Sequence, residues 1–209
     1  MIAIVDYGVG NLFSLQASFR KIGAEAVVTG DEAVIRKADR IVLPGVGAFG
    51  DAADKLRALS LDRVLTEEAG RGKSLLGICL GMQLLFSGST EFGFHPGLGL
   101  LEGRVVPIRD VIPPTLKIPQ IGWNALHFTR PSPLFAGIRE GDAVYFVHSY
   151  HAVGCEDSLL ATVDYGAPLT AAVGRRNVFG CQFHPEKSGQ VGLAILRGFC
   201  ALGGEEAAL

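Results

Sequence analysis

The chain has 209 residues, of which 48% are hydrophobic and 19% charged, and its formal net charge is −2 at pH 7. This length and composition can bury one sizeable core, and no shift in composition divides the chain, so we expect a single domain over residues 1–209. The lack of any run rich in lysine and arginine argues against nucleic acid or an anionic membrane as a partner.

The N-terminus and the cysteines predict a soluble, cytoplasmic protein. Residues 1–6 lack the basic region and the longer apolar core of a signal peptide, and no apolar run reaches the roughly 18 residues of a membrane span. The 4 cysteines, at positions 79, 155, 181 and 200, are scattered and form no Cys-x-x-Cys motif. Neither a metal site nor a disulfide framework is therefore expected, and nothing in the sequence calls for a cofactor.

The first half of the chain alternates between the periodicities of strands and helices. Apolar runs predict strands at 2–5, 26–28, 40–43 and 74–79. Apolar residues at helical spacing predict helices over 11–22, 49–72 and 80–86. Alternation of this kind implies a parallel sheet covered by helices on both faces.

The second half is richer in strands. Apolar runs between glycine, proline and asparagine predict strands at 104–108, 143–147, 159–163, 170–173 and 178–183. Little helix is expected before residues 191–202, and 87–101 and 111–119 are predicted loops. We expect these strands to form an antiparallel extension together with the remaining strands of the sheet.

Cys79 lies in Gly77-Ile78-Cys79-Leu80-Gly81, where a strand-like apolar run meets a helix-like one. The pattern predicts a nucleophile elbow, a sharp turn that lifts its central side chain clear of the sheet. The flanking glycines remove Cβ atoms that would clash in so tight a turn. The start of a helix would also favour the thiolate, so we expect a nucleophile here in preference to a small buried side chain.

A cysteine nucleophile needs a base, and the base needs a group that orients it. The run Phe183-His184-Pro185-Glu186 supplies both at the end of a predicted strand. Pro185 restrains the backbone on either side of it, which helps to aim the His184 imidazole and the Glu186 carboxylate at one region. Glu186 would hold the ring tautomer and stabilise the imidazolium. A histidine near a carboxylate is usually a surface pair, but with Cys79 these residues predict a catalytic triad.

The third requirement is an oxyanion hole. The backbone N–H of Leu80, directly after the nucleophile, supplies one donor. The glycine-rich segment 43–50 follows a predicted strand, so an amide of Val46 or Gly47 is the expected second donor. The same segment matches the Gly-x-Gly-x-x-Gly pattern of dinucleotide-binding proteins. That alternative is weaker, because the segment is not in the first strand-to-helix turn and no acidic residue ends a strand about 20 residues later.

Two histidines, His148 and His151, lie three residues apart. At this spacing on one strand they would point to opposite faces, so a shared metal ion is not expected. Ser149 and Tyr150 between them are candidates for a loop that contacts a substrate. The only tryptophan, Trp123, is flanked by proline and glycine and is expected either to anchor an interface or to cap a small apolar cluster.

Together these segments resemble the class I, or triad-type, glutamine amidotransferases. The resemblance spans nearly the whole chain and keeps the family's order of motifs. It rests on Pro44-Gly45-Val46-Gly47 and on the residues 77–83 and 183–186. Within the class, the residues 6–11, 122–124 and 146–150 are similar to the glutaminase subunits of imidazole glycerol phosphate synthase.

The resemblance implies a flavodoxin-like, mostly parallel sheet with helices on both faces and a smaller antiparallel extension. It implies that Cys79, His184 and Glu186 form a triad that hydrolyses glutamine to glutamate and ammonia through a thioester. It also implies an oxyanion hole made by the amides of Val46 and Leu80. The glutamine contacts that it implies are Gln83, Glu91, Ser149 and Tyr150.

The resemblance further implies a partner, since nothing in the sequence looks like a domain that would consume the ammonia. The partner would be the cyclase subunit, a (β/α)₈ barrel that forms a heterodimer with the glutaminase. It makes imidazole glycerol phosphate and AICAR from the phosphoribulosyl-formimino-AICAR ribonucleotide in histidine biosynthesis. The residues implied to face it are Asn11, Gln120, Trp123 and Asn124. The family also implies low activity for the isolated chain.

Three alternatives stay open on the sequence. The chain could be the glutaminase of another synthase, such as pyridoxal phosphate, anthranilate or aminodeoxychorismate synthase, although Trp123-Asn124 argues against these. It could be a cysteine hydrolase that acts without a partner. It could also be a binding module that keeps the fold without catalysis, against which the intact triad weighs.

Overall fold

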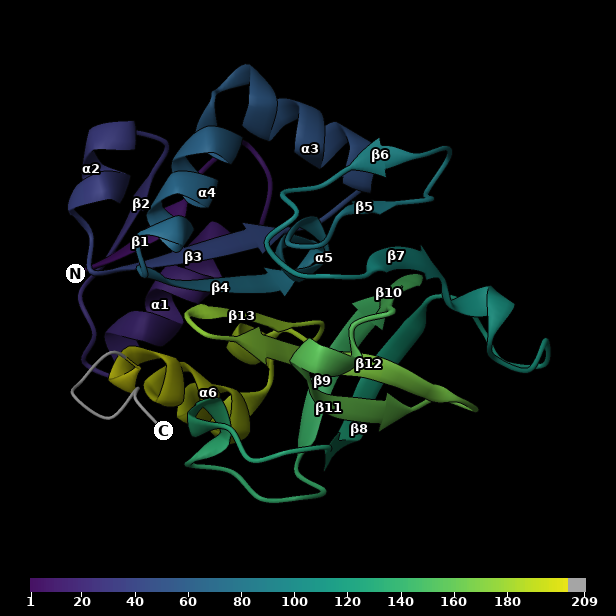
Figure 1. Ribbon diagram of the computed structural model, residues 1–209. Coiled ribbons are helices and arrows are strands. Elements are labelled where there is room, and N and C mark those ends of the chain that lie inside the picture. Colours follow the sequence, from purple (N-terminus) through teal and green to yellow (C-terminus); the bar gives the residue numbers. More distant parts are fainter. Residues whose placement is uncertain (203–209) are drawn as a thin grey trace.

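The computed structural model describes residues 1–202, which form two β-sheets with helices on both faces of the larger one (Figure 1). The larger sheet has nine strands in the order β2-β1-β3-β4-β13-β12-β11-β8-β9, and the smaller one has four in the order β10-β7-β5-β6. Strand β13 pairs in parallel with β4 and antiparallel with β12, so it joins a parallel half to an antiparallel half. This is the α/β architecture predicted from the sequence.

The parallel half lies between two layers of helices. Its strands are β1 (Ile2–Val5), β2 (Ala26–Thr29), β3 (Arg40–Gly45), β4 (Ser74–Cys79) and β13 (Val178–Cys181). One face carries α1 (Leu12–Lys21) and α6 (Gly189–Ala201), and the other carries α2 (Glu32–Lys37), α3 (Phe49–Ala58) and α4 (Leu61–Gly70) (Figure 1).

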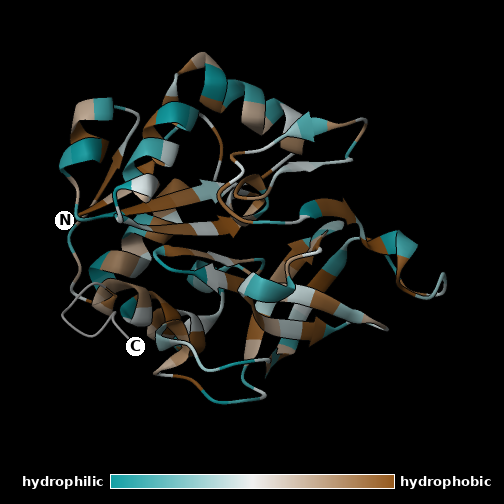
Figure 2. Ribbon diagram, in the orientation of Figure 1, coloured by the Kyte–Doolittle hydropathy of each residue, from teal (hydrophilic) through white to brown (hydrophobic). Residues whose placement is uncertain are grey.

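Burial on both faces explains the continuous apolar runs of the parallel strands. Because side chains alternate along a strand, Ile2 and Ile4 of β1 join the core with α1 and α6, whereas Ala3 and Val5 join the core with α2, α3 and α4. All four residues are buried. Figure 2 shows the same hydrophobic character along the central strands β3 and β4. A strand buried on both faces has no polar alternation, as expected for parallel sheets.

The antiparallel half and the smaller sheet complete the structure. The remaining strands of the larger sheet are β8 (Gln120–Phe128), β9 (Ala143–His148), β11 (Leu159–Asp164) and β12 (Pro168–Arg175). The smaller sheet consists of β5 (Gly88–Ser89), β6 (His95–Pro96), β7 (Arg104–Pro107) and β10 (Tyr150–Val153). It packs against α3 and against α5 (Leu80–Leu84), the short helix that follows β4.

Several predicted boundaries are wrong for local reasons. The helix predicted over 49–72 is two helices, because Ser60 between them adopts a left-handed backbone with φ 57°. The helix α2 was missed because its six residues are too few for an apolar repeat; the carboxylate of Asp31 caps its first N–H groups. Strand β13 ends at Cys181 instead of 183, α5 ends at Leu84 instead of 86, and α6 begins at Gly189 instead of 191.

The strands β5, β6, β8 and β10 have no counterpart in the prediction. β5 and β6 have two residues each, too few to show a period of two. β10 follows β9 after a single residue, so the sequence shows no break between the two strands although they belong to different sheets. Within residues 1–202, no helix combines the length and the hydropathy needed to cross a membrane.

Candidate active site

Cys79 is the last residue of β4, and α5 begins directly after it. Its backbone has φ 54° and ψ −113°, in the left-handed region that side chains rarely adopt. A Cβ atom on Gly81 would overlap with the carbonyl oxygen of Leu43, and one on Gly77 would lie 2.6 Å from the carbonyl oxygen of Gly81. Both glycines are therefore required. The predicted nucleophile elbow is present, and tight backbone packing holds its strained turn in place.

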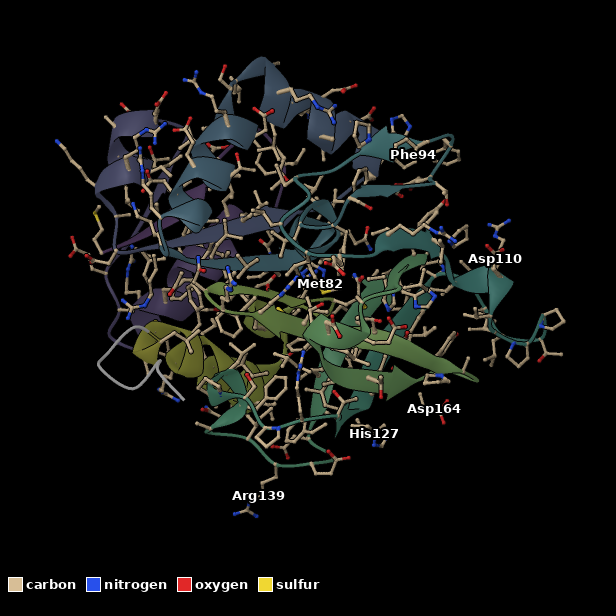
Figure 3. All side chains as sticks on the ribbon, viewed as in Figure 1. Met82, Phe94, Asp110, His127, Arg139 and Asp164 are labelled. Atoms are coloured by element: carbon tan, nitrogen blue, oxygen red, sulfur yellow. The ribbon has the colours of Figure 1, made fainter. Side chains whose placement is uncertain are left out.

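The short helix α5 fixes the elbow against the sheet. Its residue Met82 points toward β13 (Figure 3) and lies so close to Gly180 that a Cβ atom there would clash with it. With only five residues, α5 provides a small helix dipole. The positive charge that a thiolate needs must therefore come mainly from a side chain.

That side chain is His184. Its backbone N–H donates to the carbonyl of Tyr145 at 2.9 Å, which anchors the segment after β13 to β9. Its Nδ1 lies 2.9 Å from Oε1 of Glu186, and the two side chains are each only 3% exposed. The Cys79 side chain lies near the same ring, where it raises the pKa of the imidazole. The structure thus brings Cys79, His184 and Glu186 together as nucleophile, base and orienting carboxylate require.

The surroundings of His184 favour its charged form. Burial lowers the pKa of His184, but the hydrogen bonds to Cys79 and Glu186, with the charges of both, outweigh burial and raise the pKa to about 9. At neutral pH the ring is therefore an imidazolium beside the sulfur. An imidazolium stabilises the thiolate, which is the nucleophilic form of cysteine.

A cavity of about 530 Å³ opens at Cys79 and His184. This volume lies in the usual range for sites that take small molecules. The predicted oxyanion and glutamine residues all line it: Val46, Gly47, Leu80, Gln83, Glu91, Ser149 and Tyr150. The sequence did not single out four other lining residues: Phe92, Arg109, Pro119 and Val147. His148 completes the wall.

The register of β3 and β4 brings the two predicted oxyanion donors together. Gly45 pairs with Cys79 at the ends of two adjacent parallel strands, so Val46 and Leu80 are the residues that directly follow these strands. Gly47 has a positive φ of 95°, which lets the chain turn away from the sheet at this point. Val46 and Leu80 therefore lie side by side, and both line the cavity together with Cys79.

The far part of the cavity combines opposite charges. The Oε2 atom of Glu91 accepts a hydrogen bond from the backbone N–H of Phe49 at 2.7 Å, which fixes the carboxylate at the start of α3. Burial and the charge of Glu91 raise the pKa of Tyr150, whereas the nearby Arg109 lowers it. A carboxylate and a guanidinium thus both lie near Tyr150 in the lining of the cavity.

His148 and His151 do not lie on one strand, contrary to the prediction. His148 ends β9 and His151 lies in β10. The two nitrogens of His148 lie 2.8 Å from the carbonyl oxygen of Tyr150 and 3.0 Å from the amide of Gln120. Burial lowers the pKa of His148 to about 4, so the ring is neutral at neutral pH. Among residues 1–202, no group of three or more His, Cys, Asp or Glu side chains could hold a metal ion.

The residues expected to face a partner differ in their exposure. Trp123 on β8 is 64% exposed, and its ring lies 4.7 Å from that of Tyr145. Asn11 and Asn124 are partly buried. Gln120 is completely buried, because the pleat of β8 turns it toward His148. Its assignment to the surface was therefore wrong.

The comparisons with known proteins agree with this fold. The family model of class-I glutamine amidotransferases matches residues 3–201. The chain therefore belongs to the class I glutamine amidotransferase family. A solved structure of PurLQS from Thermotoga maritima has the same fold, with a TM-score of 0.75 at 21% identity over 95% of this chain and 96% of that chain.

Curated relatives narrow the family further. Imidazole glycerol phosphate synthase subunit HisH of Bacillus velezensis is 50% identical over 209 residues, which cover 99% of this chain and 98% of the relative. The subunit of the same name from Syntrophotalea carbinolica is 50% identical over 203 residues, which cover 95% and 98%. These likenesses place the chain among the HisH-type glutamine amidotransferase subunits and confirm the resemblance seen in the sequence.

Proposed function

We propose that the chain hydrolyses glutamine and delivers the ammonia to the cyclase subunit of imidazole glycerol phosphate synthase, in histidine biosynthesis. One observation carries the proposal. The buried His184 lies between the Cys79 side chain and Glu186, at the wall of a cavity large enough for an amino acid. The relatives named above support the choice of synthase.

In the proposed mechanism, the Cys79 thiolate attacks the side-chain amide carbon of glutamine. The amides of Leu80 and Val46 would hold the negative oxygen of the tetrahedral intermediate. The His184 imidazolium then protonates the departing nitrogen, so that the C–N bond breaks, ammonia leaves and a thioester remains. Next, His184 takes a proton from water, which attacks the thioester and releases glutamate and the thiolate.

We further propose that the cavity recognises glutamine by its two backbone charges. The carboxylate of Glu91 would pair with the α-ammonium group, and the guanidinium of Arg109 would attract the α-carboxylate. Ser149 and Tyr150 would close the remaining wall around the aliphatic part. Gln83 would act mainly through the hydrogen bonds that its amide makes to the protein, since its nitrogen already donates to the carbonyl of Tyr150 and to Gln182.

The partner is proposed to be a (β/α)₈-barrel cyclase that forms a heterodimer with this chain. Trp123 supports the position of this interface, because large exposed aromatic side chains commonly anchor protein contacts. Asn124 and Asn11 would lie in the same interface. We also propose that the whole chain acts as one glutaminase domain in the cytoplasm, where its four unpaired cysteines would stay reduced.

The test is glutamate release from glutamine by the purified chain, alone and with the cyclase and its phosphoribulosyl-formimino-AICAR acceptor. A large rise only in the complex supports the proposal. Cys79→Ala should abolish glutamine-dependent synthesis and keep ammonia-dependent synthesis, whereas Cys200→Ala, a matched change on α6, should keep both. Full activity of the isolated chain would favour a partner-independent hydrolase. No activity in either condition would favour a binding module.

A further inference from the structure

Gln182 touches the nucleophile without lining the substrate cavity. It lies between the end of β13 and His184, and its side chain is completely buried. Its Nε2 lies 3.7 Å from the sulfur of Cys79, within hydrogen-bond range for sulfur. A buried amide that reaches the reacting sulfur from behind the cavity can act on the sulfur but not on the substrate.

A backbone carbonyl that is two hydrogen bonds away determines which end of the Gln182 amide is the oxygen and which is the nitrogen. The carbonyl oxygen of Tyr150 can only accept, so the group of Gln83 that lies 3.1 Å from it must be the nitrogen. The same nitrogen lies 3.0 Å from Gln182, which must therefore present its Oε1. The nitrogen of Gln182 is then left to face Cys79. A hydrogen-bond donor, not an acceptor, points at the sulfur.

The other neighbours of the sulfur make this donor important. The carbonyl oxygen of Val147 lies 3.9 Å from the sulfur and can bond only to the protonated thiol. Tyr7 and Cys181 give the sulfur no hydrogen, because the Tyr7 hydroxyl donates to the carbonyl of Pro44 and the Cys181 thiol to that of Gly77. Burial and the charge on Cys79 raise the pKa of Tyr7, and burial with the charges of Glu186 and Cys79 raises that of Cys181. Both stay neutral at neutral pH. His184 is thus the one cationic side chain among these contacts, and Gln182 is the neutral donor that acts with it.

We propose that Gln182 is a positioning residue for the nucleophile. Its amide, oriented by Gln83 and by the carbonyl of Tyr150, donates a hydrogen bond to the Cys79 sulfur and favours the thiolate over the thiol. The proposal rests on the proposed role of Cys79 in glutamine hydrolysis. The contact itself needs neither glutamine nor a partner, so it can be tested without either.

The test is the rate at which iodoacetamide alkylates Cys79, measured against pH on the purified full chain. Mass spectrometry of the peptide that contains Cys79 excludes signal from the other three cysteines. Gln182→Leu removes the donor at similar volume. We expect the midpoint of the pH profile to rise by about one unit and the rate at pH 7 to fall about tenfold. In the complex, kcat for glutamine should fall while KM stays unchanged.

Two further variants separate this role from a purely structural one. Thr170→Val removes a buried hydroxyl that lies 3.7 Å from the sulfur of Cys155, a matched contact at another cysteine. It should lower stability without moving the Cys79 midpoint. Gln182→Glu keeps the acceptor for Gln83 but places a carboxylate oxygen at the sulfur, so it should raise the midpoint further. Should Gln182→Leu not fold, Gln182→Glu alone decides.

An unchanged midpoint in the Gln182 variants, or an equal shift in Thr170→Val, would overturn the inference. These outcomes are distinct from failure of the proposed function. A shifted midpoint in a protein that releases no glutamate would support the contact and refute the glutaminase. An unchanged midpoint in an active glutaminase would do the reverse.

Discussion

Replacing Glu186 by glutamine tests how the triad keeps its histidine charged. The carboxylate lies 2.9 Å from Nδ1 of His184, and both side chains are almost fully buried. Glutamine keeps the size of the side chain and an oxygen that can still accept from the ring. The change therefore removes mainly the negative charge.

The structure sets the direction of the effect. The pKa of His184 rises from 6.5 to about 9 although burial lowers it, so the contributions of Cys79 and Glu186 together exceed the net rise. Loss of the Glu186 charge therefore lowers the pKa of His184, and we expect a shift of about one unit, which corresponds to ~1.4 kcal/mol. The variant ring should then titrate near pH 8 or below. We expect kcat for glutamine to fall about tenfold, because ~1.4 kcal/mol less stabilisation of the charged imidazolium in the transition state corresponds to a factor of ten in rate.

The direct assay is an NMR titration of the histidine rings. The chain has only 5 histidines, so His184 can be assigned by substitution. Glu140→Gln is the matched control, since Glu140 lies 3.0 Å from the exposed His127 in a similar pair far from the sulfur. It should leave the His184 titration and the activity unchanged. A His184 pKa in Glu186→Gln equal to or above that of the unmodified protein would refute the reasoning.

Three further predictions concern stability. Gly81→Ala should lower the free energy of unfolding by ~3 kcal/mol or more, because the new Cβ would overlap with backbone that cannot move. Gly70→Ala is the control, since its Cβ has open space and should cost nothing. Equal urea midpoints of the two variants would contradict this. The folded-state pKa of His184 is raised, so its contribution to stability is complete below about pH 6.5 and should be lost as the pH rises toward about 9. Denaturation of the unmodified protein and of Glu186→Gln at several pH values measures this loss. Burial lowers the pKa of His148 and of His151 to about 4. The free energy of unfolding should therefore fall by up to about 1.4 kcal/mol per pH unit for each ring as the pH falls from 6.5 to 4. A flat profile in this range would show that the rings are charged in the folded state as they are in the unfolded state.

The reacting groups could be predicted because short segments encode them. The turn at Cys79 needs glycine at two fixed offsets, and the base and its carboxylate lie two residues apart around Pro185. The spacing of the residues in these segments is enough to predict their local geometry. The same holds for the parallel strands, whose burial on both faces leaves uninterrupted apolar runs.

The supporting groups could not be predicted, because their roles depend on contacts between distant segments. Gln182 contacts Gln83, 99 residues away in the sequence. Gln120 is buried only because β8 pairs with β9 and faces His148. Arg109 reaches the cavity from a short 3₁₀ helix that follows β7. Nothing in the residues around these positions distinguishes them from ordinary polar side chains.

The position of β13 between β4 and β12 has a consequence for synthesis of the chain. The nucleophile lies at the end of β4, but the base follows β13, about a hundred residues later, and strand pairing over such separations forms slowly. A nascent chain that still lacks the segment after β12 already carries Cys79 but has no imidazolium to ionise it. Its sulfur would react like that of an ordinary cysteine. The pairing of the nucleophile with its base thus arises only when the last strand closes the sheet.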